Sequence, residues 1–548
     1  PMMDYSKRYI IVFNGEIYNT SELKKKINAK ILKGNSDTEI LINLYAKYRS
    51  KMLGFIDGMF SFVIYDKIEK TCFVARDRFG IKPLYYQKLK NKMIISSEIK
   101  PLINYTKNNN FNNKAFRDFF LKGYLDHDEH TFIKNIYSLK PGNFIKTNLK
   151  NYDYKSYWNI RNDIDFNQGK KSEIKKLLNE SIKKHLISDR EIGLFLSGGT
   201  DSGIALHLIN KFSKYKIKTF TYDFEGSGNF GESKLAKKIS KSYNVRNYNE
   251  IVKPSYVLKN FDKMINKLES PFTSMRLFGT DKLYKASAKN NLKVIIEGHG
   301  GDEMLGGYGY NKFPYLLDNN FKKNAKIDEI ILKTLNDLKD KKFSINEYQF
   351  ALKNQGLATT DGSCFFEKKI IKKNIFKNKN NFFNYSISEL KKYGFLKYSQ
   401  IQDIESIKIP RVLKYSDRIS MSYGIETRVP LLDKKLFQYC FNLDNNQKYL
   451  DGVSRHLIKK IFEKEKISHF FTKNKKSIVD PQTKWLKTSL KDFLMDNIKT
   501  KNLHNIEFLD PKQVKRYCDQ FMKGKIQNSF LIFSLLTTLR FIDNFKRY

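Results

Sequence analysis

Residues 195–202 read Phe-Leu-Ser-Gly-Gly-Thr-Asp-Ser and join an apolar run to a helix-like pattern at 203–209. Gly198 and Gly199 would let backbone N–H groups turn inward, while the Ser197 and Ser202 hydroxyls add hydrogen-bond donors. The start of the following helix supplies partial positive charge, so this segment predicts an anion site. The Walker pattern GxxxxGK[ST] and the dinucleotide pattern GxGxxG are both absent at this strand end. A tight turn with an Asp cap is the plainer alternative.

A second apolar run, residues 293–296, ends in Glu-Gly-His-Gly-Gly-Asp-Glu at 297–303. Ligands of open parallel sheets lie beyond the carboxyl ends of the strands, so we expect this loop and the first one to face one cleft. Asp302 and Glu303 are the expected Mg²⁺ carboxylates, because Mg²⁺ combines one or two carboxylates with phosphate oxygens. A solvated acidic turn is the alternative interpretation.

The elements that would carry these loops are strands alternating with amphipathic helices from about residue 172 onward, which predicts a parallel sheet covered on both faces. The preceding residues, 1–155, carry short β-branched and aromatic runs and one helical stretch near 36–48, which predicts an α+β domain with packed sheets. A chain of 548 residues exceeds one hydrophobic core, so two domains, 1–155 and 172–548, are expected. The strands are expected near residues 9–13, 59–65, 71–75, 84–86, 93–96, 192–196, 219–222 and 294–296.

The net charge of +44 admits a nucleic-acid or membrane-surface binder, but the lysines are scattered in pairs and triplets along the whole chain. We therefore expect a residue bias without a nucleic-acid partner. The longest apolar stretch, 529–539, is far shorter than the ~20 residues of a membrane span and predicts a core helix. No leader pattern opens the sequence, so a cytoplasmic location is expected.

The SGGxDS loop resembles the PP-loop of ATP pyrophosphatases, and the chain as a whole resembles the glutamine-hydrolysing asparagine synthetases. The resemblance lies in residues 14–19, 36–39 and 75–85, and in the run Ser-Asp-Arg-Ile-Ser-Met-Ser-Tyr-Gly-Ile-Glu-Thr-Arg-Val-Pro-Leu-Leu-Asp at 416–433. It implies an N-terminal-nucleophile, class II amidotransferase domain with two sheets between helices. A PP-loop domain of the adenine nucleotide alpha hydrolase type, with a helical C-terminal extension, would follow.

For the first domain, the resemblance implies that the Asn14 side chain and the Gly15 N–H hold the oxyanion of glutamine hydrolysis. Glu16 and Asp37 would complete the glutamine site, with Asp37 holding the amino group; a simple Asn-Gly turn is the alternative. The family's nucleophilic Cys lies several dozen residues upstream of this motif, so we expect that the chain begins inside a longer protein. As written, it should lack glutaminase activity, because Cys72 cannot present a free α-amino group.

For the second domain, the resemblance implies that ATP and aspartate form β-aspartyl-AMP and pyrophosphate, and that ammonia from glutamine then gives asparagine. Lys475 would stabilise the transferring phosphorus as a point charge, although a surface lysine is the alternative. Mg²⁺ and ATP are the implied cofactors, the other partners are small molecules, and a homodimer stays open. The implied ATP-binding residues are Leu196, Ser197, Gly198, Gly199, Asp201, Ser202, Tyr222, Glu297 and Gly298.

Two positions depart from the family's pattern. His299 stands where the common motif Ser-Gly-Glu-Gly-x-Asp-Glu has an acid implicated in ammonia attack, and an imidazole could transfer protons near neutral pH. Arg455 replaces the family's lysine, which is not conservative at a phosphate-facing site. The acceptor is therefore aspartate or another carboxylate, such as a sugar acid of surface polysaccharides. A PP-loop enzyme that modifies RNA is a further alternative, which would show steeply salt-dependent binding.

Overall fold

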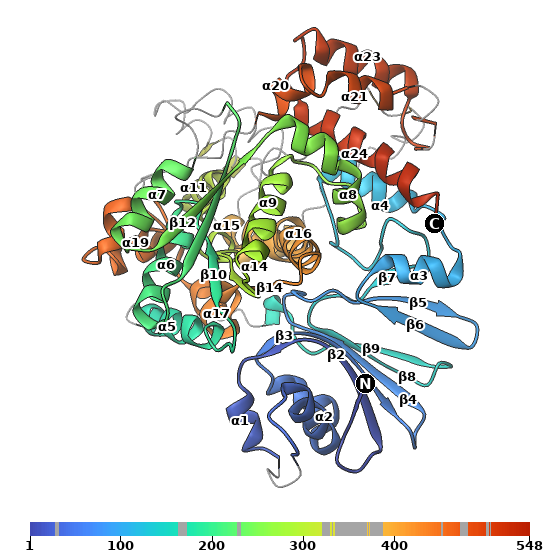
Figure 1. Cartoon of the computed structure of the whole chain (residues 1–548), viewed down its shortest axis with the longest axis vertical. Helices are drawn as coiled ribbons and strands as arrows, with labels where there is room; N and C mark the ends of the chain where they lie inside the picture. The colour runs from blue at the N-terminus through green and yellow to red at the C-terminus, as the bar shows by residue number, and fades with distance from the viewer. Residues whose placement is uncertain are drawn as a thin grey trace.

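The computed structural model contains two sheet-bearing regions that follow one another along the chain (Figure 1). The first region is the blue and cyan block of packed sheets, and the second region, coloured mainly green to red, contains a separate sheet. The structure describes residues 1–27, 32–162, 173–226, 232–320, 387–450, 453–471, 481–499 and 506–548, together with residues 329, 330, 333, 334, 370, 372, 503 and 504.

The first sheet has six antiparallel strands in the spatial order β1-β2-β3-β4-β8-β9. Strand β2 runs beyond the predicted stretch because its pairing with β3 continues to Ile17 opposite Gly58. The predicted strands at 59–65 and 71–75 are confirmed. The six strands are β1 (Met2–Met3), β2 (Tyr9–Ile17), β3 (Gly58–Asp66), β4 (Thr71–Arg76), β8 (Asn143–Thr147) and β9 (Tyr152–Ser156).

The two faces of this sheet are covered differently. Phe62 and Ile64 face helices α1 (Thr20–Lys24) and α2 (Asp37–Tyr48), whereas Val63 between them faces the second sheet, as a period of two requires. The second sheet, in the order β6-β5-β7, carries helices α3 and α4 on its far side. The helix–sheet–sheet–helix order confirms the predicted fold. Its further elements are β5 (Tyr85–Leu89), β6 (Lys92–Ser96), β7 (Tyr137–Ser138), α3 (Ile99–Thr106) and α4 (Asn113–Lys122).

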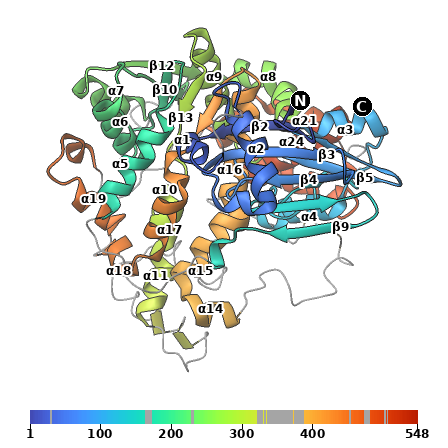
Figure 2. The ribbon, with the colours of Figure 1, turned by 90° about the horizontal axis from the view of Figure 1, so that it is seen from below.

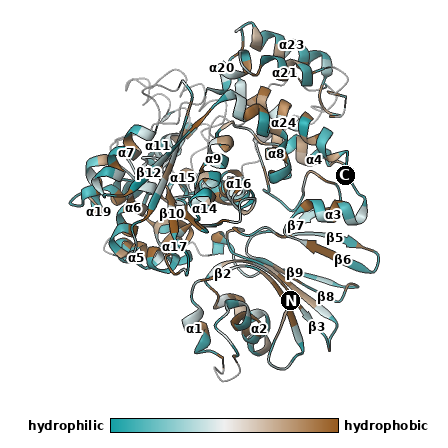
Figure 3. Ribbon diagram, in the orientation of Figure 1, coloured by the Kyte–Doolittle hydropathy of each residue, from teal (hydrophilic) through white to brown (hydrophobic). Residues whose placement is uncertain are grey.

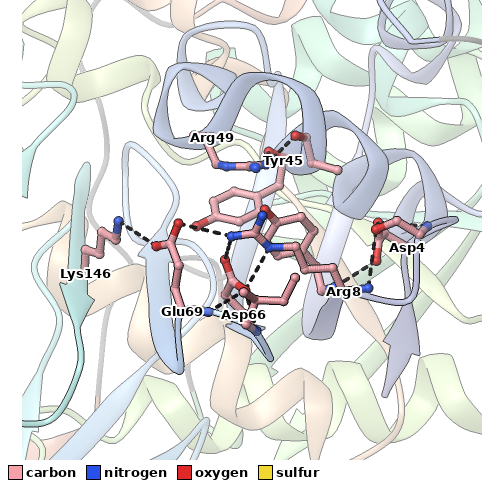
Figure 4. Close-up of polar contacts among 11 residues, drawn as sticks. Asp4, Arg8, Tyr45, Arg49, Asp66, Glu69 and Lys146 are labelled. Carbon is pink, nitrogen blue, oxygen red and sulfur yellow. Dashed lines mark hydrogen bonds and ion pairs between the residues drawn. The ribbon is translucent and has the colours of Figure 1, made fainter.

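An ion-pair cluster closes one end of the first sheet (Figure 4). Arg8 donates to both carboxylate oxygens of Asp66, at 2.9 and 2.6 Å, and to Glu69 at 3.1 Å. The Arg8 hydrogen bond is the main reason that the pKa of Asp66 falls to about 2. Tyr9 pairs with Asp66 in the register, so this cluster lies at one end of the β2–β3 pairing, and the Ile17–Gly58 pair lies at the other end.

The second region contains a five-stranded parallel sheet in the order β12-β11-β10-β13-β14. The predicted strands near 192–196, 219–222 and 294–296 are confirmed as β10, β11 and β13. The edge strands β12 and β14 carry few consecutive apolar residues, which explains why periodicity does not reveal them. The strands are β10 (Ile192–Phe195), β11 (Lys218–Phe224), β12 (Arg246–Val252), β13 (Val294–Ile296) and β14 (Glu426–Arg428).

Helices cover both faces of the parallel sheet, as its continuous apolar strands require. Ile295 packs into the core that contains helices α8 (Pro254–Leu268) and α9 (Arg276–Lys289). The next residue, Ile296, packs into the opposite core, which contains α5 (Glu173–His185), α6 (Thr200–Phe212) and α7 (Ser233–Ser242). The sheet edge that carries the two glycine loops is thereby held between two apolar layers.

The C-terminal part is helical and is closed by α24 (Ser529–Phe545), whose apolar residues are largely buried (Figure 3). This confirms the predicted core helix. Among the described helices, none is long and apolar enough to cross a membrane. The remaining elements are α10 (Gly301–Leu305), α11 (Lys312–Asn319), α14 (Ile387–Tyr393), α15 (Phe395–Gln402), α16 (Ile409–Met421), α17 (Lys434–Asn442), α18 (Asn445–Lys448), β15 (Tyr449–Leu450), β16 (Val453–Ser454), α19 (His456–Ile461), α20 (Gln482–Lys487), α21 (Lys491–Asn497) and α23 (Pro511–Met522).

Helix α16 joins the two regions (Figure 2). Its Asp417 accepts a hydrogen bond from Lys82 at 3.0 Å, and its Lys414 donates to Asp126 at 2.7 Å. All four side chains are at most 8% exposed. Burial alone would lower the pKa of Lys82, but the neighbouring carboxylates, Asp417 first among them, outweigh it and raise that pKa. Buried pairs of this kind fix the orientation of the two regions, since breaking one leaves a charge without compensation.

Candidate active site

The SGGxDS loop leaves strand β10 and enters helix α6. Gly198 has φ +73°, a conformation that L side chains rarely adopt, and a Cβ there would lie 3.2 Å from Leu235. The hydroxyls of Ser197 and Ser202 lie 3.1 Å apart, and the Ser197 hydroxyl accepts the Gly199 N–H at 3.3 Å. The loop therefore gathers hydroxyl and N–H groups at the start of α6, as an anion site needs.

The loop after β13 packs against this segment. A Cβ on Gly301 would lie 2.7 Å from the Asp201 carboxyl carbon, so only glycine allows this approach. Gly298 likewise lies beside Asp201 and the Ser202 N–H, with 3.4 Å between its ideal Cβ and either group. The structure thus brings together the two loops that the sequence places at the carboxyl edge of one sheet.

Arg455 bridges the two loops. Its Nη1 lies 2.7 Å from the Asp201 carboxylate and 3.2 Å from the Asp302 carboxylate. Burial alone would lower the pKa of this guanidinium, which is 3% exposed, but the charges of Asp201 and Asp302 outweigh it and raise the pKa. An internal cation therefore already balances the two acids that stand nearest the anion site.

Glu303 has a different surrounding from Asp302, although the two are adjacent in α10. Its oxygens accept the Tyr308 hydroxyl at 2.6 Å and the Gly300 N–H at 3.1 Å. Burial and the neighbouring Asp302 charge raise the pKa of Glu303. A metal role for both residues stays a prediction, and it is Asp201 that shares the Arg455 guanidinium with Asp302.

Glu297, His299 and Ser416 form a compact cluster beside these loops. Ser416 Oγ donates to Glu297 Oε2 at 2.6 Å, and His299 Nε2 lies 2.9 Å from the same oxygen. The Tyr284 hydroxyl donates to Glu297 Oε1 at 2.8 Å. Burial alone would raise the pKa of Glu297, but the charge of His299 and these hydrogen bonds outweigh it, so the pKa lies below its usual value.

The structure says less about the roles of three other residues that were predicted for the synthetase side, which are Tyr222, Lys475 and Leu196. The Tyr222 ring lies against Gly279 of α9, where an ideal Cβ would approach the ring atoms to 2.2–2.5 Å. Its contact with an adenine ring stays a prediction. Lys475 lies outside the described residues. The main chain of Leu196 is fixed by its neighbouring strand, since its N–H donates to the Phe220 carbonyl at 2.9 Å.

The predicted oxyanion residues lie on strand β2. A Cβ on Gly15 would meet the Met59 carbonyl oxygen at 2.1 Å, so the close pairing of β2 with β3 requires glycine here. Asn14 Nδ2 donates to the Ser97 hydroxyl at 3.2 Å. Cys72 lies within β4 opposite Thr147, and burial raises the pKa of its thiol, which suits a structural rather than a nucleophilic cysteine.

Glu16 and Asp37, the acids predicted to bind glutamine, lie in the first region, and their neighbours only partly balance the effect of burial on their charges. Burial is the main cause that raises the pKa of Glu16 to about 7, and Arg428, 3.6 Å away, only partly offsets it. Burial also raises the pKa of Asp37, which accepts the Ile17 N–H at 3.3 Å. Arg428 is itself held by Glu426 at 2.7 Å. Two desolvated acids close together favour a cationic group.

The sequence patterns did not identify Ser416, Tyr284 or Arg428 as site residues. Ser416 is 119 residues and Tyr284 is 13 residues from Glu297 in the chain, and neither belongs to a recognisable spacing with it. The run that begins at Ser416 carried the family resemblance and was the one available signal. Their positions follow from the packing of α9, α16 and β14 around β13.

The family comparison agrees with this architecture. The family model described as asparagine synthase matches residues 173–542, and the one described as a glutamine amidotransferase domain matches residues 1–158. This chain belongs to the asparagine synthase family, with a glutamine amidotransferase domain of the N-terminal-nucleophile type before its PP-loop domain.

Individual relatives are only modestly similar. Asparagine synthetase [glutamine-hydrolyzing] 1 of Bacillus subtilis is 24% identical over 98% of this chain and 85% of its own length. The second such enzyme of that organism is 29% identical over 84% of this chain, which spans 60% of that relative. Amidase chry2 of Gibberella zeae is 23% identical over 91% of this chain and 81% of its own. The matches thus include differently named enzymes.

Proposed function

We propose that this protein is an ATP-dependent amide synthetase that converts aspartate to asparagine. Aspartate and ATP give β-aspartyl-AMP and pyrophosphate, and nitrogen from glutamine or from ammonia then displaces AMP. The observation that carries this proposal is the meeting of the SGGxDS loop with the loop at 298–303, which gathers anion donors and carboxylates at one sheet edge. Family membership supports the same chemistry.

Several residues of this chain would act on ATP. The Ser197 and Ser202 hydroxyls and the N–H groups at the start of α6 would hold phosphate oxygens. Gly298, which lies beside Ser202, leaves room for the nucleotide between the loops. Arg455 presents a cation between the two loops, so its guanidinium would face the charge that develops as pyrophosphate departs.

The carboxylates fit a bound Mg²⁺. A Cβ on Gly307 would lie 2.0 Å from Asp302 Oδ1, so the close packing of this carboxylate against residue 307 requires glycine. Asp201 and Asp302 both contact Nη1 of one guanidinium, and this convergence supports the proposal that the two carboxylates would hold one metal ion. Such hard oxygens match the preference of Mg²⁺. When bound there, Mg²⁺ would neutralise charge on the leaving pyrophosphate.

On the glutamine side, Asn14 and the Gly15 N–H would stabilise the tetrahedral oxyanion of amide hydrolysis. Asp37 and Glu16 would hold the ammonium group of glutamine, because both are acids held in partly desolvated positions. Helix α16 lies between this region and the synthetase loops, and its Ser416 contacts His299 and Glu297. The two predicted chemistries therefore lie on either side of one helix.

The proposal is tested by exchange of radiolabelled pyrophosphate into ATP in the presence of Mg²⁺ and a panel of carboxylic acids. We expect exchange that depends on aspartate and does not require glutamine or ammonia, since adenylation precedes amide formation. Exchange with none of the acids would contradict adenylate chemistry, and exchange with a different acid alone would contradict aspartate as the acceptor.

A second candidate is amidation of a carboxylate other than aspartate. The specific observation that favours it is the Glu-Gly-His sequence at 297–299, whose two side chains contact each other where the common family motif has a serine and a glutamate. The similarity to a fungal amidase agrees with a wider range of substrates in these relatives. The same exchange panel, extended to sugar acids, separates the two candidates.

A further inference from the structure

Glu297 and His299 differ in how far their side chains are exposed to solvent. Both follow strand β13 and are separated by Gly298, so their side chains leave the same sheet edge. Glu297 is buried, with a side-chain exposure of 6%, whereas His299 is 35% exposed. The carboxylate therefore lies beneath the imidazole, and the imidazole is the member of the pair that can reach a substrate.

The carboxylate of Glu297 is held from three directions. Ser416 of α16 and Tyr284 of α9 each donate to one of its oxygens, and His299 Nε2 lies 2.9 Å from Oε2. The Tyr284 hydroxyl also lies 2.7 Å from the Thr427 hydroxyl of β14. Since Tyr284 donates to Glu297, Thr427 donates to Tyr284. This chain of hydrogen bonds favours an ionised Glu297.

An ionised Glu297 fixes the protonation of its neighbour. A carboxylate only accepts hydrogen bonds, so His299 Nε2 must carry a proton toward it. In the neutral ring Nδ1 is then the basic nitrogen. The negative charge below the ring also stabilises the imidazolium that forms when Nδ1 takes a proton. Of the ionisable groups that the structure describes, Glu303 interacts with the charge of His299, and Asp417 interacts with Tyr284.

We propose that His299 is the general base of amide formation and that Glu297 is its positioning residue, held in place by Ser416 and Tyr284. This inference rests on the proposed function. The lone pair of ammonia forms the C–N bond to the acyl carbon, and the acyl C–O bond breaks so that AMP leaves with its electron pair. The nitrogen loses one proton to His299 Nδ1, which yields a neutral amide and an imidazolium.

The assignment explains the departure from the family's common motif. That motif carries serine and glutamate at the positions of Glu297 and His299, and this chain carries an acid at the first position and an imidazole at the second. In this chain the acid stands two residues earlier than in that motif, and its Oε2 lies 2.9 Å from His299 Nε2. If the acid of that motif acts as a base, the base of this chain would be an imidazole supported by a carboxylate.

The first test separates the two half-reactions in His299→Ala and Glu297→Gln. In His299→Ala, pyrophosphate exchange should stay within about threefold of the unmodified protein. Amide formation from ammonium should fall about 10²–10⁴-fold in the first variant and about 10–100-fold in the second, by comparison with other residues that support a functional group. In Glu297→Gln the acidic limb of the pH–rate profile should move to lower pH, because imidazolium loses its stabilising charge.

The chain offers a matched control pair in His207 and Glu465, whose side chains lie 3.6 Å apart and contact Tyr243 and Lys175 instead of the site. His207→Ala and Glu465→Gln should leave both half-reactions unchanged. A double variant, Glu297→Ser with His299→Glu, should recover amide formation relative to His299→Ala. Its pH–rate profile should lack the acidic limb that titration of a histidine produces. Equal loss of both half-reactions in His299→Ala, or loss of neither, would overturn the assignment.

A measurement without substrates distinguishes failure of this inference from failure of the proposed function. Histidine labelled with ¹³C at Cε1 allows the titration of His299 to be followed by NMR and assigned with His299→Ala. The His299 titration should move to lower pH in Glu297→Gln and should not move in Glu465→Gln. An unchanged titration in Glu297→Gln would overturn the pairing even if adenylation is confirmed.

Discussion

The glutamine side and the synthetase side of this molecule both bury acids, but they balance them differently. Glu16 has a pKa of about 7, because burial outweighs an arginine at 3.6 Å. In contrast, Asp201 and Asp302 share the Arg455 guanidinium, and Glu297 has a lowered pKa beside His299. Under the proposed function, the first site would receive a cation from its substrate, whereas the second already holds Arg455 between two of its acids.

The largest expected effect comes from removing the internal cation. Arg455→Ala removes the guanidinium that contacts both Asp201 and Asp302, which should lower the free energy of unfolding by about 3–5 kcal/mol. Pyrophosphate exchange should also be lost. Urea unfolding and the exchange assay measure the two effects.

Arg455→Lys is the matched control, since it keeps the charge but loses the two-sided contact of a guanidinium. It should retain most of the stability and part of the exchange. An Arg455→Ala protein as stable as the unmodified one would show that the two acids do not depend on this cation.

A comparable effect is expected where the two regions meet. Lys82→Met leaves Asp417 buried without its cation and should cost about 3–5 kcal/mol of unfolding free energy. The double variant with Asp417→Asn should lose less than the sum of the two single changes, because the residues contact each other at 3.0 Å. Additive losses in urea unfolding would contradict direct coupling of the regions through this pair.

A smaller effect is expected at the anion loop. Gly198→Ala places a side chain at φ +73° and should cost about 1–2 kcal/mol. Gly226→Ala is the matched control, because Gly226 has φ +80° and no atoms within 4 Å of its ideal Cβ. Both variants should lose similar stability, but only Gly198→Ala should lose pyrophosphate exchange. Equal pyrophosphate exchange in the two variants would contradict a role for this loop in ATP binding.

The smallest effect concerns the pH dependence of stability on the glutamine side. The folded pKa of Glu16, about 7, exceeds its ordinary value of 4.5, so the folded state binds more protons and stability falls as pH rises from about 4.5 to 7. Glu16→Gln should flatten this part of the stability profile. The ionisation of Asp66 affects stability in the opposite direction. Its folded pKa is about 2, so its stabilising contribution is lost as the pH falls from 3.8 through 2.

Thermal unfolding across pH measures both slopes. Asp66→Asn should remove the loss of stability that occurs below about pH 3.8. It should leave the slope of stability between pH 4.5 and 7 unchanged. If Glu16→Gln leaves that slope as it is in the unmodified protein, the contrast between the two sites would not hold.

Local sequence patterns predicted central elements of both regions. The strand at 294–296 is an uninterrupted apolar run, and the helix at 37–48 begins where the Ser36 hydroxyl accepts the Thr38 N–H. The two glycine loops were also predictable, because the carboxyl ends of parallel strands meet at one sheet edge. The family resemblance supplied the roles of these residues.

Long-range contacts were not predictable in this way. Ser416 reaches Glu297 only because α16 packs beside β13, and Arg428 reaches Glu16 only because β14 joins the sheet edge next to the first region. The direction of a carboxylate is also set by tertiary packing, as the different partners of Asp302 and Glu303 show. Roles for Lys475 and Tyr222 stay predictions.

The most direct test of the central claim is the fate of ATP when this protein is mixed with Mg²⁺, aspartate and ¹⁵N-ammonium. Free ammonia supplies the nitrogen without glutamine hydrolysis, so the assay isolates the synthetase side. We predict that AMP, pyrophosphate and asparagine with ¹⁵N in its side-chain amide form in equal amounts and only when aspartate is present. Intact ATP, or cleavage to ADP and phosphate, would contradict adenylation of aspartate at the SGGxDS loop.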